Sequence, residues 1–384
     1  MLKIVLLLVS FAIACPAVEI STGNMLGKGY DARLFYFRDA TQAPWRPTYV
    51  GAKYRPEAAG RLMNLRIAQA LFDDEWLTEI PFNREVNTDR VIAALETYRE
   101  HGVLAINVSL QGGNPGYSVE VHEIQRSYTA RLGRSQGALV SAFQPDGSLK
   151  AAWMGRLLRL QRALDERGMF LVLMYFYEGQ NGVLRDSEAI QRAVVNATDW
   201  LVRNKCRNVI IEIANEYDLP EWKYDPWIQD HIGDLIELAR KQFPPDFRLP
   251  ISASTMGMTI YPMIRKHADL TIVHGNTRSP EEKRRGVAAL MADTTAPGPI
   301  LMDEDNNGRE ATREHLTKEV ASCDAVFESG GSWGYMPWRQ VQMFPFRFYL
   351  PEVGHKLHPD VSSDDRDQAY FRSVLEHIRA LAFK

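Results

Sequence analysis

From about residue 60 onward, short apolar runs alternate with longer segments in which apolar residues recur every three or four positions. The short runs are typical of buried strands, and the longer segments are typical of amphipathic helices. Strand and helix patterns alternate along the rest of the chain. The predicted strands span residues 63–70, 103–110, 169–176, 208–214, 249–254, 270–274, 300–304 and 325–333.

The predicted helices are clearest in four places. In the first of these, Leu157 and Leu164 share one side of the helix, Arg159 lies opposite, and Gly168 ends it. No linker-like stretch rich in Gly, Ser or Pro interrupts the repeat. The pattern therefore predicts an α/β fold, a single-domain (β/α)₈ TIM barrel over residues 61–384, rather than an open doubly wound sheet. The four helices span residues 151–167, 187–203, 227–242 and 366–381.

The N-terminus does not follow the repeat. Residues 1–17 have a charged start at Lys3 and an apolar run too short to span a bilayer, which predicts a signal peptide and an exported protein without a transmembrane span. Small residues before Cys15 resemble a bacterial lipobox, so a lipid anchor at Cys15 and ordinary cleavage are both open, and the protein is expected to be periplasmic, an outer-membrane lipoprotein or secreted. Residues 18–60 are predicted to be an extension that covers the bottom or flank of the barrel.

The charge balance narrows the class of ligand. The chain has 45 Lys and Arg against 48 Asp and Glu, a formal net charge of -3, which gives no field suited to nucleic acid or anionic lipid. A neutral substrate fits best. Cys206 and Cys323 precede apolar runs and are expected to be buried free thiols, with a disulfide as the alternative, and no Cys/His spacing predicts a metal or cofactor site.

Two strands end in carboxylates. Residues 208–216 end in Asn215 and Glu216, and residues 299–308 carry Glu304 between two Asp residues. Strands four and seven face each other across an eight-stranded barrel, and active sites lie at the C-terminal ends of barrel strands. Two Glu in this arrangement can flank one glycosidic bond, one as the acid that protonates the leaving oxygen and the other as the nucleophile that attacks the anomeric carbon.

Other polar or aromatic residues end neighbouring strands and should meet at the same face. The long connection 111–150 also lies there, and long loops of this kind are more often functional than accidental. Its position favours a role around the same site. The predicted substrate-binding residues are Arg66, Asn107, Tyr175, Asn215, His274 and Trp333.

Together these residues resemble the clan A glycoside hydrolases, and most closely the cellulase-like family 5 barrels. The resemblance implies hydrolysis of β-linked oligo- or polysaccharides with retention, with Glu216 as acid/base and Glu304 as nucleophile. It further implies that Asn215 holds the sugar 2-hydroxyl and that Arg66 orients Glu304. It also implies that His274 lies beside the pair and that Trp333 forms the floor of the sugar subsite.

Two departures from the family pattern leave alternatives open. The seventh strand reads Met-Asp-Glu-Asp-Asn rather than ending in Glu-Phe or Glu-Trp, so Asp303 or Asp305 could replace Glu304 as the nucleophile. Asn107 also stands where family 5 enzymes commonly have a His-rich turn nearby. Flat aromatic side chains suit carbohydrate, and the candidates in the loops are Tyr117, Trp222, Trp227, Trp333, Tyr335, Trp338, Phe344 and Phe346.

Two other functions also fit the pattern. A catalytically silent carbohydrate-binding barrel would keep the aromatic loops and leave one Glu idle. A divalent-metal-dependent hydrolase or isomerase would use carboxylate ligands together with a histidine. The candidate ligands for that metal are Asp303, Glu304, Asp305 and His274.

Overall fold

The computed structural model describes residues 18–39, 43–73, 82–112, 140–180, 182–220, 222, 226–308, 310–342, 346, 349–351 and 362–384. The predicted signal peptide with Cys15, most of the connection 111–150, Tyr117 and Phe344 lie outside these residues. Within the described ranges, no helix is both long and apolar enough to cross a membrane.

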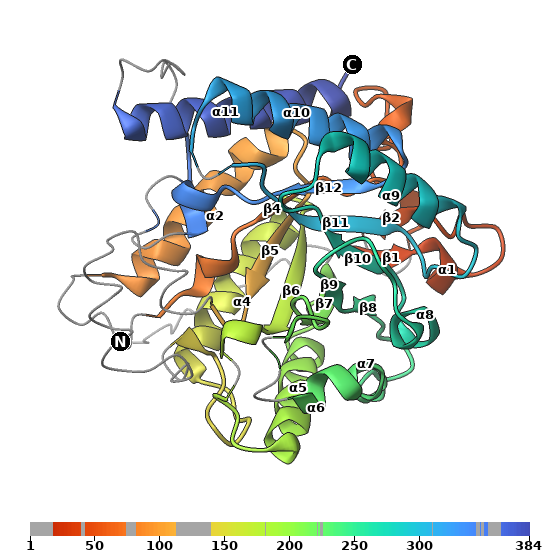
Figure 1. Ribbon diagram of the computed structural model, residues 1–384. Helices are drawn as coiled ribbons and strands as arrows, with labels where there is room; N and C mark the ends of the chain where they lie inside the picture. Colours follow the sequence, from red (N-terminus) through yellow and green to blue (C-terminus); the bar gives the residue numbers. More distant parts are fainter. Residues whose placement is uncertain are drawn as a thin grey trace, which may run out of the picture.

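One parallel sheet forms the centre of the molecule, in the order β8-β7-β6-β5-β4-β12-β11-β10-β9 (Figure 1). Its two end strands, β8 and β9, are separated in sequence by Ala253 alone, so they are halves of one strand and the sheet closes on itself. The predicted (β/α)₈ barrel is therefore confirmed. The strands are β4 (Asn64–Arg66), β5 (Ala105–Ser109), β6 (Phe170–Phe176), β7 (Val209–Ala214), β8 (Ile251–Ser252), β9 (Ser254–Thr255), β10 (Thr271–His274), β11 (Ile300–Asp305) and β12 (Ser332–Tyr335).

Helices surround this ring (Figure 1). The predicted helix 227–242 is divided at His231 into two. Short helical turns η1 (Pro56–Ala58), η2 (Ala68–Leu71), η4 (Glu178–Gln180) and η6 (Trp338–Gln342) connect other elements. The helices of the ring are α2 (Arg84–Glu100), α4 (Ala151–Glu166), α5 (Ser187–Arg203), α6 (Pro226–Asp230), α7 (Ile232–Arg240), α8 (Pro262–His267), α9 (Pro280–Ala292), α10 (Arg313–Glu328) and α11 (Ser363–Ala382).

The start of the predicted eighth strand is wrong. Ala325, Val326 and Phe327 belong to the last turn of α10, and β12 begins only at Ser332. These three residues are apolar because the helix buries them against the barrel. A short apolar run fits a buried strand and a buried helix end equally well, so periodicity alone could not separate them.

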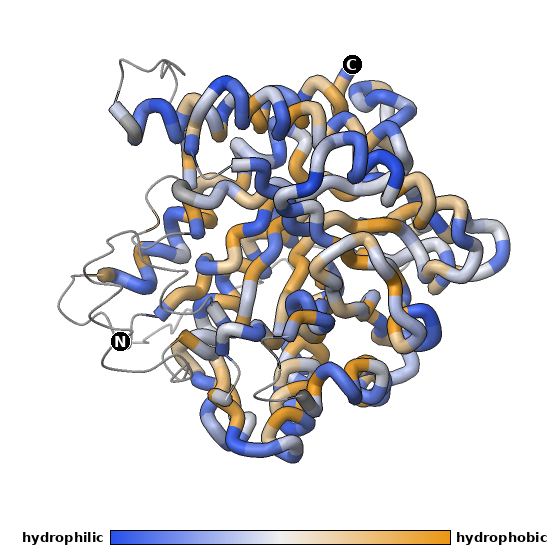
Figure 2. Tube along the Cα trace, in the orientation of Figure 1, coloured by the Kyte–Doolittle hydropathy of each residue, from blue (hydrophilic) through white to orange (hydrophobic). Residues whose placement is uncertain are grey.

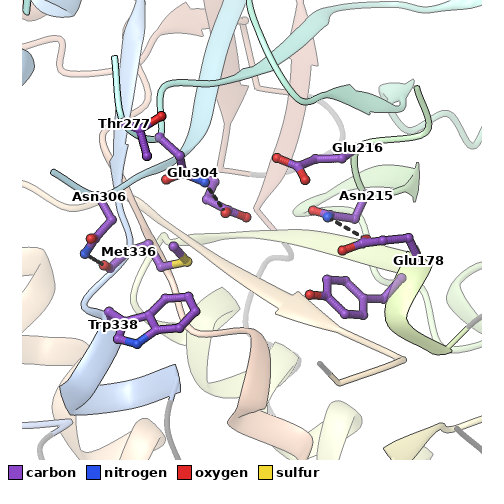
Figure 3. A pocket seen from close by; sticks show the side chains of 10 residues that line it. Glu178, Asn215, Glu216, Thr277, Glu304, Asn306, Met336 and Trp338 are labelled. Atoms are coloured by element: carbon purple, nitrogen blue, oxygen red, sulfur yellow. Dashed lines mark hydrogen bonds between the residues drawn. The ribbon is translucent and has the colours of Figure 1, made fainter. Parts of the chain in front are cut away.

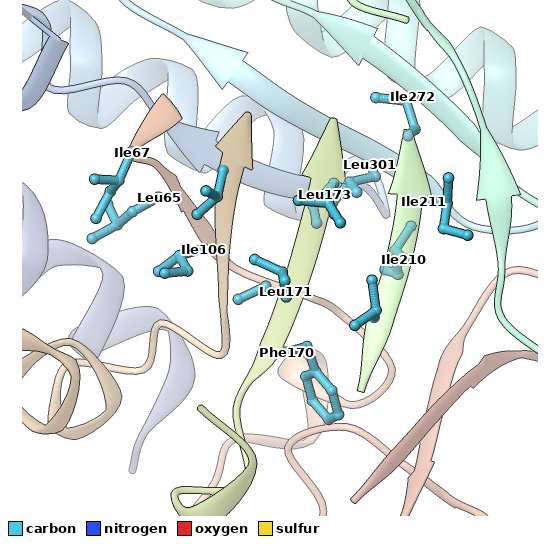
Figure 4. Packing of buried hydrophobic residues seen from close by; sticks show 14 of the residues in the cluster. Leu65, Ile67, Ile106, Phe170, Leu171, Leu173, Ile210, Ile211, Ile272 and Leu301 are labelled. Carbon is cyan, nitrogen blue, oxygen red and sulfur yellow. The ribbon is translucent and has the colours of Figure 1, made fainter. Parts of the chain in front are cut away.

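Strands β6 and β7 are almost entirely apolar, because one face of each meets the barrel interior and the other meets the helices. All seven residues of β6 and all six of β7 are buried. Figure 4 shows Leu171, Leu173 and Ile210 packed with neighbours from adjoining strands, and Figure 2 shows the apolar strands enclosed by helices of mixed hydropathy. Each such side chain contributes about 1.5–3 kcal/mol on burial, which fixes the strands that carry the site.

The segment 18–60 adds a small antiparallel sheet of β1 (Glu19–Thr22), β2 (Phe35–Arg38) and β3 (Arg46–Pro47), with α1 (Gly23–Leu26) between the first two strands. The Ile20 N–H donates to the Arg207 carbonyl at 3.2 Å, and the Asn24 amide donates to the Asp269 carbonyl at 3.0 Å. Arg207 and Asp269 come just before β7 and β10. The segment therefore lies at the N-terminal end of the barrel, away from the polar strand ends.

Cys206 and Cys323 are buried and free, as expected from the sequence. Burial raises the pKa of the Cys206 thiol to about 12, so it is a neutral core side chain.

Candidate active site

A pocket of about 250 Å³ opens at the C-terminal ends of the strands. Glu178, Asn215 and Glu216 lie on one side, Met336 and Trp338 lie on the other, and Glu304 projects between them (Figure 3). One carboxylate oxygen of Glu216 and one of Glu304 are within 4.8 Å of each other and of a nitrogen of His274. The lining residues are Tyr177, Glu178, Asn215, Glu216, Asn276, Thr277, Glu304, Asn306, Met336 and Trp338.

An irregularity in β11 decides which carboxylate enters the pocket. The register of β11 shifts against β12 between Met302 and Asp305, and against β10 beside His274. Such a bulge breaks the strict alternation of side chains. Consequently Asp303 and Glu304 both reach Arg66 inside the barrel, whereas Asp305 faces outward and lies 2.8 Å from Lys283 Nζ.

Arg66, at the end of β4, joins the two walls of the site. Its Nε lies 2.7 Å from Glu304 Oε2, and its Nη1 lies 3.1 Å from Asp303 Oδ2. Its Nη2 donates to Asn215 Oδ1. Asn276 Nδ2 donates to the other Glu304 oxygen at 2.5 Å. Both oxygens of Glu304 are therefore held, and one guanidinium fixes the nucleophile candidate and the amide opposite it.

His274 is fully buried beneath the pocket. Its Nδ1 lies 2.7 Å from Glu216 Oε1 and 3.8 Å from Glu304 Oε2, and its Nε2 lies 3.1 Å from Asp303 Oδ1. Burial by itself lowers the pKa of the imidazole, but the charges of Glu304 and Asp303 outweigh it and hold the pKa well above its usual value. The ring is thus an imidazolium among carboxylates.

Glu216 has a backbone φ of 40°, in the left-handed region that is uncommon for residues other than glycine. Its N–H donates to Ser254 Oγ at 2.8 Å, and its carbonyl accepts the indole N–H of Trp222 at 3.0 Å. Strained backbone of this kind persists where surrounding contacts determine it, and it is concentrated at functional sites. Here these contacts aim the side chain into the pocket.

Five carboxyl groups and two cations occupy this region. Burial, with the nearby charge of Asp303, raises the pKa of Glu212 to about 8. Burial, with the charge of Glu216, likewise raises the pKa of Glu178 to about 8. Both are therefore mainly protonated at pH 7, and the other three carboxyl groups, those of Glu216, Asp303 and Glu304, lie beside Arg66 or His274.

Three of the predicted substrate-binding residues do not line this pocket. Trp333 is fully buried on the outer face of the wall, where its indole N–H donates to Asp305 Oδ2 at 2.8 Å. Tyr175 also faces outward, and its hydroxyl lies 3.1 Å from Thr198 Oγ1 of α5. Asn107 lies inside the barrel, below the pocket, and donates to Asp303 Oδ2 at 2.8 Å.

Trp338, three residues after the end of β12, lines the pocket, whereas Trp333 does not. The remaining described aromatic candidates have structural contacts: Trp222 bonds to the Glu216 carbonyl, Trp227 stacks on His231 and Phe346 packs on Phe72. Tyr335 packs against the buried Tyr370.

Glu178 is a pocket residue that the sequence analysis did not single out. It comes two residues after β6, just beyond Tyr177, and the rule that strand ends form the active face could have found it. Asn306, Thr277 and Met336 likewise follow the ends of β11, β10 and β12, within one to three residues.

Of the four proposed metal ligands, Asp303, Glu304 and His274 lie close together, whereas Asp305 does not join them. Asp305 is on the far side of β11, and Glu304 is bonded to Arg66. Two overlapping groups of three acidic or histidine side chains do lie close together, but His274 is shared by both and its nitrogens already contact carboxylates. Arg66 supplies the positive charge at this point, so the donor set does not suit a divalent cation.

No family model matches the sequence, and no curated protein sequence matches it. Solved structures do resemble the fold. A family 5 xyloglucanase from Paenibacillus pabuli aligns with 10% identity over 82% of this chain and 98% of that chain, with a TM-score of 0.51. A putative glycoside hydrolase from Bacteroides vulgatus aligns with 13% identity over 84% of this chain and 55% of that chain, with a TM-score of 0.50.

An exo-β-1,4-mannosidase from an Opitutaceae bacterium aligns with 16% identity over 75% of this chain and 54% of that chain, with a TM-score of 0.48. The chain thus spans about half the length of this protein and of the Bacteroides protein. At these identities the comparison establishes the fold alone: the chain forms a (β/α)₈ barrel like those of the two proteins with TM-scores of 0.50 and 0.51.

Proposed function

We propose that this chain is a retaining glycoside hydrolase that cleaves β-linked glycosidic bonds in an oligo- or polysaccharide. The supporting observation is that carboxylate oxygens of Glu216 and Glu304 lie within 4.8 Å of each other at one pocket. Retaining enzymes need carboxyl groups about 5–5.5 Å apart, whereas inverting enzymes leave roughly 6.5–9.5 Å for a water molecule.

Glu304 is the nucleophile in this proposal. Arg66 and Asn276 hold its two oxygens, which fixes the orientation of the carboxylate. It attacks the anomeric carbon as the bond to the leaving oxygen breaks, giving a covalent glycosyl-enzyme. Water then attacks the same carbon, and Glu304 leaves as a carboxylate.

Glu216 is the acid and then the base. It gives a proton to the leaving oxygen in the first step and takes one from the attacking water in the second. The Glu216–His274 contact of 2.7 Å keeps a proton beside this carboxyl group. By its likeness to the clan A enzymes, Asn215 holds the sugar 2-hydroxyl.

The pocket lining favours a neutral sugar. Three of its ten described lining residues are Glu, and none of those ten is Lys, Arg or His. A uronic acid would place another negative charge beside Glu304 without a matching cation. Trp338 offers an apolar face on which the C–H groups of a pyranose ring can stack.

Two substitutions test the proposal on aryl β-glycosides and on oligosaccharides. Glu304→Gln should abolish turnover of every substrate, on the order of 10⁴-fold or more, because no glycosyl-enzyme can form. Glu216→Gln should slow oligosaccharide hydrolysis by about 10²–10⁴-fold but affect a 4-nitrophenyl glycoside far less, since a good leaving group needs no proton. Rates are measured by reducing-sugar release and by nitrophenolate absorbance.

Other outcomes would assign the roles differently. Substantial turnover by Glu304→Gln would move the nucleophile to Asp303. Equal losses on both kinds of substrate would remove Glu216 from the acid role. Sugar binding without turnover by the unsubstituted protein would instead support a catalytically silent carbohydrate-binding barrel.

We also propose that the protein is exported, on the basis of residues 1–17. Intact-mass measurement of protein purified from its native host tests this: a mature chain should begin near residues 15–18, with additional acyl mass if Cys15 is lipidated. A full-length chain beginning at Met1 would contradict export.

A further inference from the structure

Glu178 is a third carboxyl group in the pocket, in addition to the two that the proposed reaction uses. It begins η4, immediately after β6, and faces the pocket beside Asn215 (Figure 3). The Asn215 amide nitrogen donates to Glu178 Oε2 at 2.9 Å. Since Glu216 and Glu304 supply both chemical roles, this contact calls for a separate explanation.

Two hydrogen bonds fix the orientation of the Asn215 side-chain amide. Its Oδ1 accepts a hydrogen bond from Arg66, so the amide nitrogen must face the other way, toward Glu178. An amide nitrogen carries two hydrogens, and the bond to Glu178 uses one of them. In the proposed function, the other hydrogen is the donor to the sugar 2-hydroxyl. Glu178 therefore lies next to the place of that hydroxyl.

The state of the Glu178 carboxyl group suits a neutral hydroxyl. Burial and the charge of Glu216 raise its pKa to about 8, while the bond from Asn215 acts in the opposite direction. At neutral pH the group is a carboxylic acid with an acceptor oxygen and an O–H donor. One oxygen accepts from Asn215, and the group keeps a further donor for a ligand.

We propose that Glu178 is a substrate-binding residue that, together with Asn215, recognises the C2 hydroxyl of the sugar bonded to the nucleophile. This inference rests on the proposed function. Glu178 and Asn215 contact the sugar at C2, and the substrates are sugars with a free hydroxyl at this carbon. Sugars with no oxygen at C2 obtain no binding free energy from Glu178 and Asn215.

The experiment compares 4-nitrophenyl β-D-glucoside and β-D-mannoside with 4-nitrophenyl 2-deoxy-β-D-arabino-hexopyranoside. The last compound is the 2-deoxy form of both sugars, so it is a matched control for either. Glu178→Ala should lower kcat/KM for the preferred parent sugar by roughly 10–100-fold, because buried polar groups lose their partners, and should change turnover of the 2-deoxy compound less than about twofold.

Glu178→Gln should restore most of the loss seen with alanine, because the amide also offers one acceptor and a donor. Combining Glu178→Ala with Asn215→Ala separates direct from indirect action. A direct contact predicts that Glu178→Ala still lowers parent-sugar kcat/KM in the Asn215→Ala background. No further loss there would make Glu178 a positioning residue for Asn215 and would overturn the proposal.

Equal losses on parent and 2-deoxy substrates would also overturn it. If the unsubstituted protein hydrolyses none of the aryl β-glycosides and oligosaccharides that test the proposed function, that function has failed and not this inference alone. Melting by circular dichroism checks that each variant is folded. Should the alanine variant not fold, Glu178→Asp, which withdraws the carboxyl by one methylene group, serves in the same comparison.

Discussion

Ser254 stabilises the unusual backbone of Glu216 through a single hydrogen bond. Ser254→Ala would leave the Glu216 N–H without this acceptor, at a residue with a φ of 40°. A lost hydrogen bond is worth about 0.5–1.5 kcal/mol, so we expect roughly a tenfold fall in kcat for oligosaccharides and a smaller one for 4-nitrophenyl glycosides. Steady-state kinetics with both substrates measures the difference.

Ser252→Ala is the matched control, because Ser252 is equally buried and its hydroxyl donates to the Leu270 carbonyl at 2.8 Å. It should lower stability without a leaving-group dependence. If both variants show the same kinetic pattern, the Ser254 bond does not position the acid.

Trp338 and Trp333 should respond oppositely to substitution. Trp338→Ala should raise KM by about tenfold, because a stacking surface of the pocket is lost. Trp333→Phe removes the donor to Asp305 and should cost about 1–3 kcal/mol of unfolding free energy without raising KM. An increase in KM for Trp333→Phe would return that residue to the sugar subsite.

Single site residues could be predicted from the sequence where they directly follow a clear strand, because barrel active sites lie at the C-terminal ends of the strands. Glu216 and Glu304 end clear apolar runs, and both line the pocket. Trp333 does not line the pocket, because it lies inside a strand, where the face that a side chain occupies depends on register. The bulge in β11 that separates Glu304 from Asp305 is a tertiary feature with no local signature in the sequence.

Strand β11 is joined to two helices by one buried ammonium group. Lys283 of α9 lies 2.8 Å from Asp305 of β11, and it donates to Ser322 of α10 at 2.9 Å and to Asn307 at 2.7 Å. Lys283→Met leaves Asp305 buried without its charge partner. We expect a loss of about 3–5 kcal/mol of unfolding free energy in urea titrations, together with reduced activity because Asp305 adjoins Glu304.

Lys318→Met provides the control on α10. Its ammonium group lies 2.7 Å from Glu314, but both side chains are largely exposed. Such pairs contribute about 0.3–0.5 kcal/mol. Similar losses for the two variants would show that burial does not strengthen the Lys283 pair.

Elements with a long and regular pattern were predicted well. Helix 151–167 corresponds to α4, and helix 187–203 corresponds to α5. The eighth strand was extended backward into α10, because an apolar helix end and a buried strand have the same composition over a few residues. The buried Lys283 could not have been predicted, since the charges that accompany it come from distant parts of the chain.

For the whole molecule, buried carboxylic acids determine whether the unfolding free energy rises or falls with pH. Burial, with the charges of Asp303 and Asp305 respectively, raises the pKa of Glu212 and of Glu319 to about 8. Between pH of about 4.5 and 8, each group holds a proton in the folded state and has lost it in the unfolded state. The unfolding free energy therefore falls as pH rises, by up to about 1.4 kcal/mol per pH unit for each group.

His274 acts in the same direction above its ordinary pKa, because its raised pKa keeps it protonated in the folded chain. We expect Tm to be highest near pH 5 and to fall toward pH 8 in differential scanning calorimetry. Glu319→Gln should flatten this fall, since one of the raised groups is removed. A Tm that is level or rises over this range would show that these acids are ionised in the fold.

The fifth barrel strand is divided into β8 and β9, so the amount of backbone pairing differs around the barrel. Strands β8 and β9 have two residues each, and each pairs with a single neighbour, whereas β11 has six residues and is paired on both sides. Local opening is easiest where backbone hydrogen bonds are fewest. Ser254, which accepts the hydrogen bond from the Glu216 N–H, belongs to this divided strand. The proposed acid/base residue is therefore held by a strand that can open locally. Glu304, the proposed nucleophile, lies instead on β11, whose pairing on both sides resists such opening.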